Sequence, residues 1–253
     1  MLKDLLTLNV FGILLIFARV GTAIAVLPGF SAAYVPVRIR LGLALAISFL
    51  LGPVLAAGLP TLPGSVPGLG LLIAGEMLTG AFIGTIARVL ISSLQTAGTV
   101  IAYTSSMANA LIQDPIAEQQ SSTVSGFLVL AGLTLIFVAD MHHLMLRAIV
   151  DSYTIFVPGE GLPVGDFSHL LARHVADSFK LGLQLAAPFV ITGLTYYIGL
   201  GLLGRLMPQL QVFFFGLPLQ IAIQIWVLTV TFSGLMLVFM NHFAESYAAF
   251  LRP

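Results

Sequence analysis

The chain has 253 residues, of which 58% are hydrophobic and only 8% are charged. Ordinary soluble domains carry about 25% charged residues, so a chain of this composition cannot cover itself with polar surface and is expected to be an integral membrane protein. Ten Lys plus Arg balance ten Asp plus Glu, which leaves no basic field to bind nucleic acid. The absence of cysteine excludes disulfides, thiol catalysis and thiolate metal sites.

Long charge-free intervals predict helices able to cross a bilayer, which takes about 20 apolar residues. Apolar runs and Pro or Gly breakers together indicate six hydrophobic helices. They cover residues 8–27, 41–57, 71–94, 124–140, 181–203 and 217–240. The runs are apolar on all sides, unlike the alternating segments of about ten residues in a β-barrel. The expected fold class is therefore an all-α integral membrane protein.

The N-terminus resembles a secretory signal, because Lys3 precedes an apolar run and Ala23-Ile24-Ala25 has the pattern of a cleavage site. Arg19 interrupts that run, however, and the run continues past the candidate site to Leu27. We therefore expect this segment to be retained as the first helix.

Three connecting segments differ in character. Residues 58–70 contain three prolines and are expected to be extended, because proline disrupts a helix interior. Residues 95–122 are polar although they lie between two apolar helices. Residues 158–166 carry three glycines and two prolines, and predict a boundary between a long N-terminal part and a C-terminal helical hairpin that turns at 204–216.

Catalytic and metal-binding motifs are missing from the sequence. The only lysines, Lys3 and Lys180, do not follow a glycine-rich loop, which excludes a phosphate-cradling motif. The adjacent His142 and His143 would point about 100 degrees apart on a helix, so no metal site is expected there. The serines of residues 92–125 lack a nearby histidine that could activate one. We expect neither an enzyme nor a cofactor.

Four charged residues, Arg19, Glu76, Arg88 and Asp140, lie inside or at the ends of apolar helices, where a charge is costly unless it is paired. Glu76 and Arg88 are twelve residues apart and cannot pair along one helix. Two interpretations stay open, namely structural pairing between subunits and a proton relay. Gly80 and Gly84 form a small-residue face that would admit either another helix of this chain or a neighbouring subunit.

Four segments together resemble the FliR family, which is known in injectisomes as SctT. They are RVGTAIAVLPGFSAAYVPVRIR at 19–40, the stretch 98–115 ending in Asp114-Pro115, His143-Leu144 with Asp151-Ser152-Tyr153 and Pro158-Gly159, and MPQLQVFFFGLPLQI at 207–221. The match spans nearly the whole chain in order. Gly216-Leu217-Pro218-Leu219 resembles the flagellar branch more than the injectisome branch.

The resemblance implies a FliP-like part at residues 1–170 followed by a FliQ-like helical hairpin at 171–253. It implies a subunit of the flagellar type III export gate, in the bacterial inner membrane at the flagellar basal body, which assembles with FliP and FliQ and has FlhB and FlhA as further partners. Unfolded flagellar proteins would be its cargo, and lipid would surround it. The alternatives are an injectisome SctT subunit and, from another class, a secondary transporter, although the two halves show no matching interrupted helices.

The resemblance also implies a pore plug at residues 104–122. Its polar composition agrees with a watery cavity, because a lipid-exposed loop would leave backbone groups unpaired; the alternative is an ordinary surface loop. The residues assigned to the plug are Thr104, Ser105, Ser106, Met107, Asn109, Leu111, Ile112, Gln113, Asp114 and Pro115.

Phe213, Phe214 and Phe215 are, by the same resemblance, expected at the narrowest part of the export channel. Three adjacent rings cannot share one helix face, and the flanking Pro and Gly disfavour an unbroken helix. At least one ring should therefore point away from its own hairpin. The alternative places the three rings in a core or in lipid.

Overall fold

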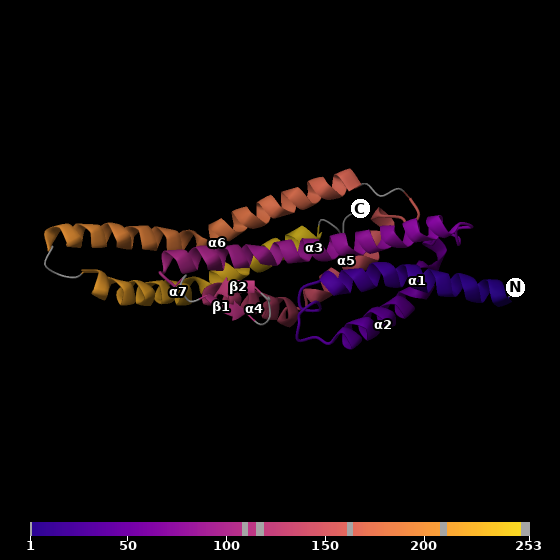
Figure 1. The fold of residues 1–253 in the computed structure, drawn as a ribbon, viewed down its shortest axis with the longest axis horizontal. Coiled ribbons are helices and arrows are strands. Elements are labelled where there is room, and N and C mark those ends of the chain that lie inside the picture. Colours follow the sequence, from indigo (N-terminus) through magenta and orange to yellow (C-terminus); the bar gives the residue numbers. More distant parts are fainter. Residues whose placement is uncertain (1, 108–110, 115–118, 161–163, 208–211, 249–253) are drawn as a thin grey trace. The chain divides into compact units, whose positions relative to one another are not determined.

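The computed structural model describes residues 2–107, 111–114, 119–160, 164–207 and 212–248, and nearly all of them are helical (Figure 1). The helices are α1 (Leu2–Val26), α2 (Val37–Leu55), α3 (Val66–Thr104), α4 (Thr123–Val138), α5 (His142–Ile155), α6 (Val164–Leu206) and α7 (Val212–Ala248), with a 3-10 turn, η1 (Ala56–Gly58), after α2. Two short strands, β1 (Leu111–Asp114) and β2 (Gln119–Ser122), pair antiparallel between α3 and α4.

Among the described residues, four helical segments are long and apolar enough to cross a membrane, namely Val37–Leu55, Val66–Thr104, Gly165–Leu206 and Gly216–Tyr247. The pair α4 and α5, interrupted at residues 139–141, adds a fifth if it forms one broken span. The predicted class, an all-α integral membrane protein, is confirmed.

The chain divides into two compact units. Unit 1 contains Met1–Val89, Phe137–His174 and Ala244–Pro253, and unit 2 contains Leu90–Ile136 and Val175–Phe243. The boundaries fall inside α3, α4, α6 and α7, so each unit draws on both the N-terminal and the C-terminal part of the chain. The division into a FliP-like part (1–170) and a FliQ-like hairpin (171–253) concerns likeness to other proteins and stays a prediction.

In unit 1, α1 and α3 pack closely through glycine. A Cβ atom on Gly80 would overlap the carbonyl of Arg19, and one on Gly84 would lie 2.7 Å from the Cβ of Val26. The small-residue face predicted from sequence is therefore occupied by a helix of the same chain. Contact between close backbones is the ordinary use of such a face in membrane helices.

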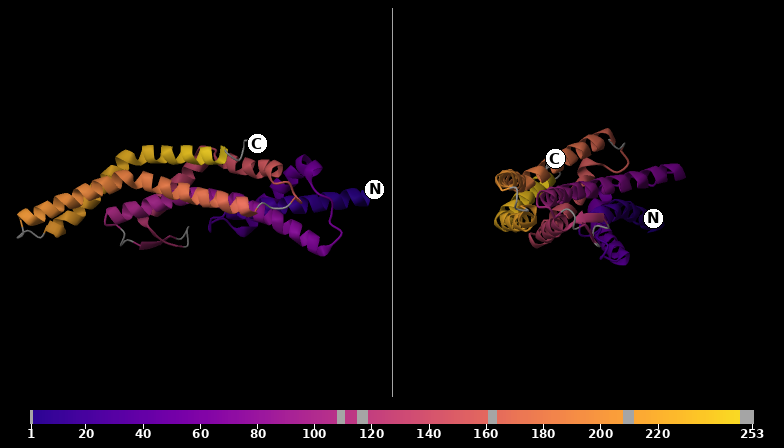
Figure 2. Two further views of the ribbon diagram at one scale, coloured as in Figure 1. Left: turned by 90° about the horizontal axis from the view of Figure 1, so that it is seen from above. Right: turned by 60° about the vertical axis from the view of Figure 1, so that its left-hand side comes forward.

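In unit 2, α6 and α7 form an antiparallel hairpin, and Figure 2 shows them side by side. Phe189 accepts a hydrogen bond from Gln224, whereas Tyr196, further along α6, bonds to Gly216, which is earlier in α7. Gly98 packs against the backbone of Ser125, which brings α3 against α4. The predicted C-terminal hairpin is thus present.

Several helix boundaries differ from the expectation, and the largest difference is at α6, which begins at Val164 where residue 181 was expected. α3 begins at Val66, inside the segment expected to be extended, because Pro67 stands in the first turn, where its missing N–H is not needed. α3 also continues to Thr104. The hydroxyls of its polar stretch are satisfied within the helix, since Thr96 donates to the carbonyl of Ser92 and Thr99 to that of Gln95.

α7 runs unbroken from Val212 through Pro218, so the expectation that Gly and Pro interrupt it is wrong. Pro218 is the seventh residue of the helix, where its missing N–H removes one hydrogen bond close to the N-terminal end. α5 was not predicted at all, because the charged Arg147 and Asp151 interrupt its apolar pattern.

Candidate functional site

A buried ion pair joins α1 to α3 in unit 1. Nε of Arg19 donates to one oxygen of Glu76 at 2.8 Å, and Nη2 donates to the other at 3.0 Å. Arg19 is 1% exposed and Glu76 is 3% exposed. Such a two-point contact matches the planar guanidinium to the carboxylate and fixes the register of the two helices.

Arg19 also donates hydrogen bonds to α5 and to the residue after it. Nη1 donates to the hydroxyl of Ser152 at 3.1 Å, and Nη2 donates to the carbonyl of Phe156 at 2.9 Å. The guanidinium carbon lies 3.9 Å from the centre of the Tyr153 ring. A buried charge is tolerable only when its hydrogen-bonding groups are used in this way. Arg19 therefore organises three helices of unit 1.

These contacts bear on the charges singled out from sequence. Arg19 and Glu76 find their partners within one chain, which removes the need for an inter-subunit partner for this pair. A cavity of about 590 Å³ adjoins both residues. Arg88 is exposed on α3, where a neighbouring molecule could reach it.

Asp140 lies in the break between α4 and α5, in the left-handed backbone region with φ of 56°. Potential ligand atoms of Asp140, His142 and His143 lie within 4.8 Å of one another. The two histidine rings are 4.1 Å apart, so the expectation that they diverge is wrong, because His142 begins α5 and stacks on Phe137. The three could hold a metal ion, but Asp140 and His143 are exposed, and we assign no metal site to them.

The described part of the predicted plug contains the paired strands β1 and β2. Thr104 is the last residue of α3, and Ser105, Ser106 and Met107 form the turn that ends it. Predicted plug residues Leu111, Ile112, Gln113 and Asp114 form β1, whereas Asn109 and Pro115 lie outside the described residues.

The turn after α3 is fastened to the α6–α7 hairpin by polar side chains. Gln220 of α7 donates to the carbonyl of Thr104 at 2.6 Å, and Ser106 donates to the side-chain oxygen of Gln220 at 3.2 Å. Tyr197 of α6 lies within hydrogen-bonding distance of both Gln220 and Ser106, at 3.1 and 3.3 Å. Sequence reasoning missed this cluster, although Gln220 stands in the quoted 207–221 motif.

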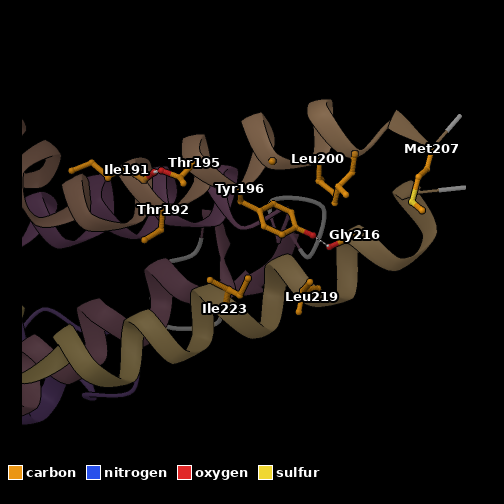
Figure 3. A pocket seen from close by; sticks show the side chains of 11 residues that line it. Ile191, Thr192, Thr195, Tyr196, Leu200, Met207, Gly216, Leu219 and Ile223 are labelled. Atoms are coloured by element: carbon orange, nitrogen blue, oxygen red, sulfur yellow. Dashed lines mark hydrogen bonds between the residues drawn. The ribbon is translucent and has the colours of Figure 1, made fainter. Parts of the chain in front are cut away.

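Phe213, Phe214 and Phe215 form part of the first turns of α7. Their side chains lie outside what the structure describes, so their role stays a prediction. Immediately after them, an apolar cavity of about 640 Å³ opens between α6 and α7 (Figure 3). Leu200, Leu219 and Ile223 are among the residues that line it, and Tyr196 donates a hydrogen bond across it to the carbonyl of Gly216.

Residues 10–246 match the family described as bacterial export proteins, family 1. The chain belongs to this family. It is 38% identical over 231 residues to the flagellar biosynthetic protein FliR of Caulobacter vibrioides, covering 91% of this chain and 92% of that protein. It is 30% identical to FliR of Bacillus subtilis, covering 91% and 90% of the two chains.

Yop proteins translocation protein T of Yersinia pestis is 27% identical over 161 residues, which cover 60% of this chain and 59% of that protein. The family assignment confirms the resemblance to FliR and SctT, and with it a subunit of a type III export gate as the function. It gives no support to the secondary-transporter alternative. Assembly with FliP and FliQ stays a prediction.

Proposed function

We propose that this family 1 export protein is the FliR-type subunit of a flagellar export gate, built with FliP and FliQ around a pore for unfolded proteins. The similarity to flagellar relatives over 90% or more of each chain carries this proposal, since the match to the Yersinia protein is shorter and weaker. FlhB and FlhA are further partners, the site is the inner membrane at the flagellar basal body, and the chain acts as a structural part of the pore rather than as an enzyme.

Exposed apolar side chains support an assembled state. Phe49 on α2 is 64% exposed, and Ile191 on α6 and Trp226 on α7 are 65% and 67% exposed. Faces of this kind are stable only against lipid or against another subunit. FliP and FliQ would cover part of them, so not every apolar helix needs to contact lipid.

Within the assembly, we assign the β1–β2 hairpin to the plug of the pore. The backbone hydrogen bonds between the strands satisfy polar groups that an irregular loop would expose. The strands also permit a defined shortening, because Leu111 stands opposite Ser122. Removing residues 112–121 and inserting Asn-Gly would join these two positions by a two-residue turn.

The shortened plug is expected to raise ion conductance of the purified gate about tenfold or more, because the barrier is removed while both helix ends keep their spacing. Conductance would be measured in planar bilayers after co-expression with FliP and FliQ. A control that replaces only residues 115–118 by Asn-Gly keeps both strands, and it should conduct much less. Equal conductance of the shortened and unaltered gates, at equal assembly, would reject the plug.

A further inference from the structure

The two ends of the segment between α3 and α4 are held in different ways. The first end leaves α3 through a Schellman-type turn, in which Met107 N–H donates to Ala102 and Ser106 N–H donates to Tyr103. Ser106 occupies the left-handed position of that turn, with φ of 59°. Glycine is the usual residue there, so serine needs contacts that hold it in this conformation.

Gln220 provides those contacts from α7. Its amide nitrogen donates to the carbonyl of Thr104 and to the hydroxyl of Tyr197, and its oxygen accepts from Ser106. Gln220 is 1% exposed, so water does not replace a bond that breaks. A single amide thereby joins the end of α3, the turn after it and both helices of the hairpin.

The second end makes polar contacts with α3. Ser122 caps α4 by accepting from the N–H of Ser125 at 3.1 Å, and it donates to the carbonyl of Gly98 at 3.4 Å. Ser125 donates to the carbonyl of Gln95 at 3.2 Å. These polar contacts do not involve Gln220 or Tyr197, whereas α4 meets α7 through the rings of Phe127 and Phe232. The first end alone is therefore joined to α7 through Gln220.

We propose that Gln220, with Tyr197 and Ser106, is a positioning contact that couples the α6–α7 hairpin to the entry of the plug segment. Gln220 lies five residues after Phe215, or about 7.5 Å along the helix. A displacement of the proposed constriction is therefore transmitted to Gln220, which releases Ser106. The coupling rests on the proposed function.

The absence of cysteine allows one introduced thiol to report on the first end. Met107→Cys would be labelled with a maleimide in the gate purified with FliP and FliQ. Gln220→Leu should speed labelling about tenfold, because it removes the hydrogen bonds that join Gln220 to Thr104 and Ser106. Gln224, one turn further along α7, donates to Phe189 instead. The control Gln224→Leu should therefore leave the labelling rate within twofold of the parent.

An introduced disulfide provides a second experiment. A Cβ atom on Gly193 would lie 3.3 Å from the Cβ of Thr104, close to the separation in a disulfide. Gly193→Cys and Thr104→Cys would be introduced into the Gln220→Leu variant and oxidised to a disulfide. Because a third cysteine would interfere, residue 107 would then carry a spin-labelled or fluorescent residue without a thiol. The disulfide should slow the motion of the turn to the rate seen with Gln220 in place. Fast motion despite a formed disulfide, or equal labelling in Gln220→Leu and Gln224→Leu, would overturn the coupling. Conductance of the shortened plug tests the proposed function separately.

Discussion

Arg19→Met is expected to destabilise unit 1 by about 3–5 kcal/mol, because it leaves the Glu76 carboxylate buried without its partner. The same change also removes the bonds to Ser152 and Phe156 that tie α5 to α1. Thermal unfolding of the purified gate, monitored by its resistance to protease, would measure the loss of stability. Arg88→Met removes an exposed arginine from α3 and should change stability by less than about 0.5 kcal/mol.

A double substitution separates the ion pair from the packing around it. Arg19→Met with Glu76→Leu leaves no buried charge, so it should be less damaging than the sum of the two single changes. Additive effects would show that Arg19 and Glu76 do not interact as the structure has them. An effect of Arg19→Met as small as that of Arg88→Met would contradict the buried network altogether.

Alanine at Phe213, Phe214 and Phe215 together is expected to raise ion leak through the assembled gate several-fold and to reduce secretion. The seal proposed here depends on apolar bulk, which excludes water from a narrow opening and closes around an unfolded chain without a fixed binding site. Leucine at all three positions keeps that bulk and should keep the seal. Ion flux and secreted flagellar protein would be measured on the same strains.

The matched control for this series is Phe179→Ala, which removes an exposed ring from α6 away from the start of α7. It should leave leak and secretion unchanged. If the triple alanine variant behaved like Phe179→Ala, the segment 213–215 would not form the constriction, and the alternative placement of the rings in a core or in lipid would be preferred.

Much of the helical content could be predicted because long apolar runs have few other solutions in a membrane. The exact extent of α3 could not be predicted from sequence. Pro67 is tolerated in a first turn, and the hydroxyls of Thr96 and Thr99 donate to carbonyls of their own helix. α5 was not predicted because a helix can bury one face, here with Met145 and Ile149, and carry charges on the other.

The sites were only partly accessible from sequence for a related reason. Arg19 and Glu76 are 57 residues apart, and Gln220 and Thr104 are 116 apart, so only the packing of helices makes them neighbours. One sequence feature does point to such contacts: a single charged or amide side chain in an apolar helix needs a polar partner on another segment. Sequence spacing does not reveal which residue is that partner.

Purification of the chain with and without FliP and FliQ tests the central claim most directly. The account predicts that the three proteins co-purify in mild detergent as one complex, and that the chain expressed alone is aggregated or readily cleaved, because its apolar faces lack their partners. A monodisperse, protease-resistant single chain that does not retain FliP or FliQ would contradict the account.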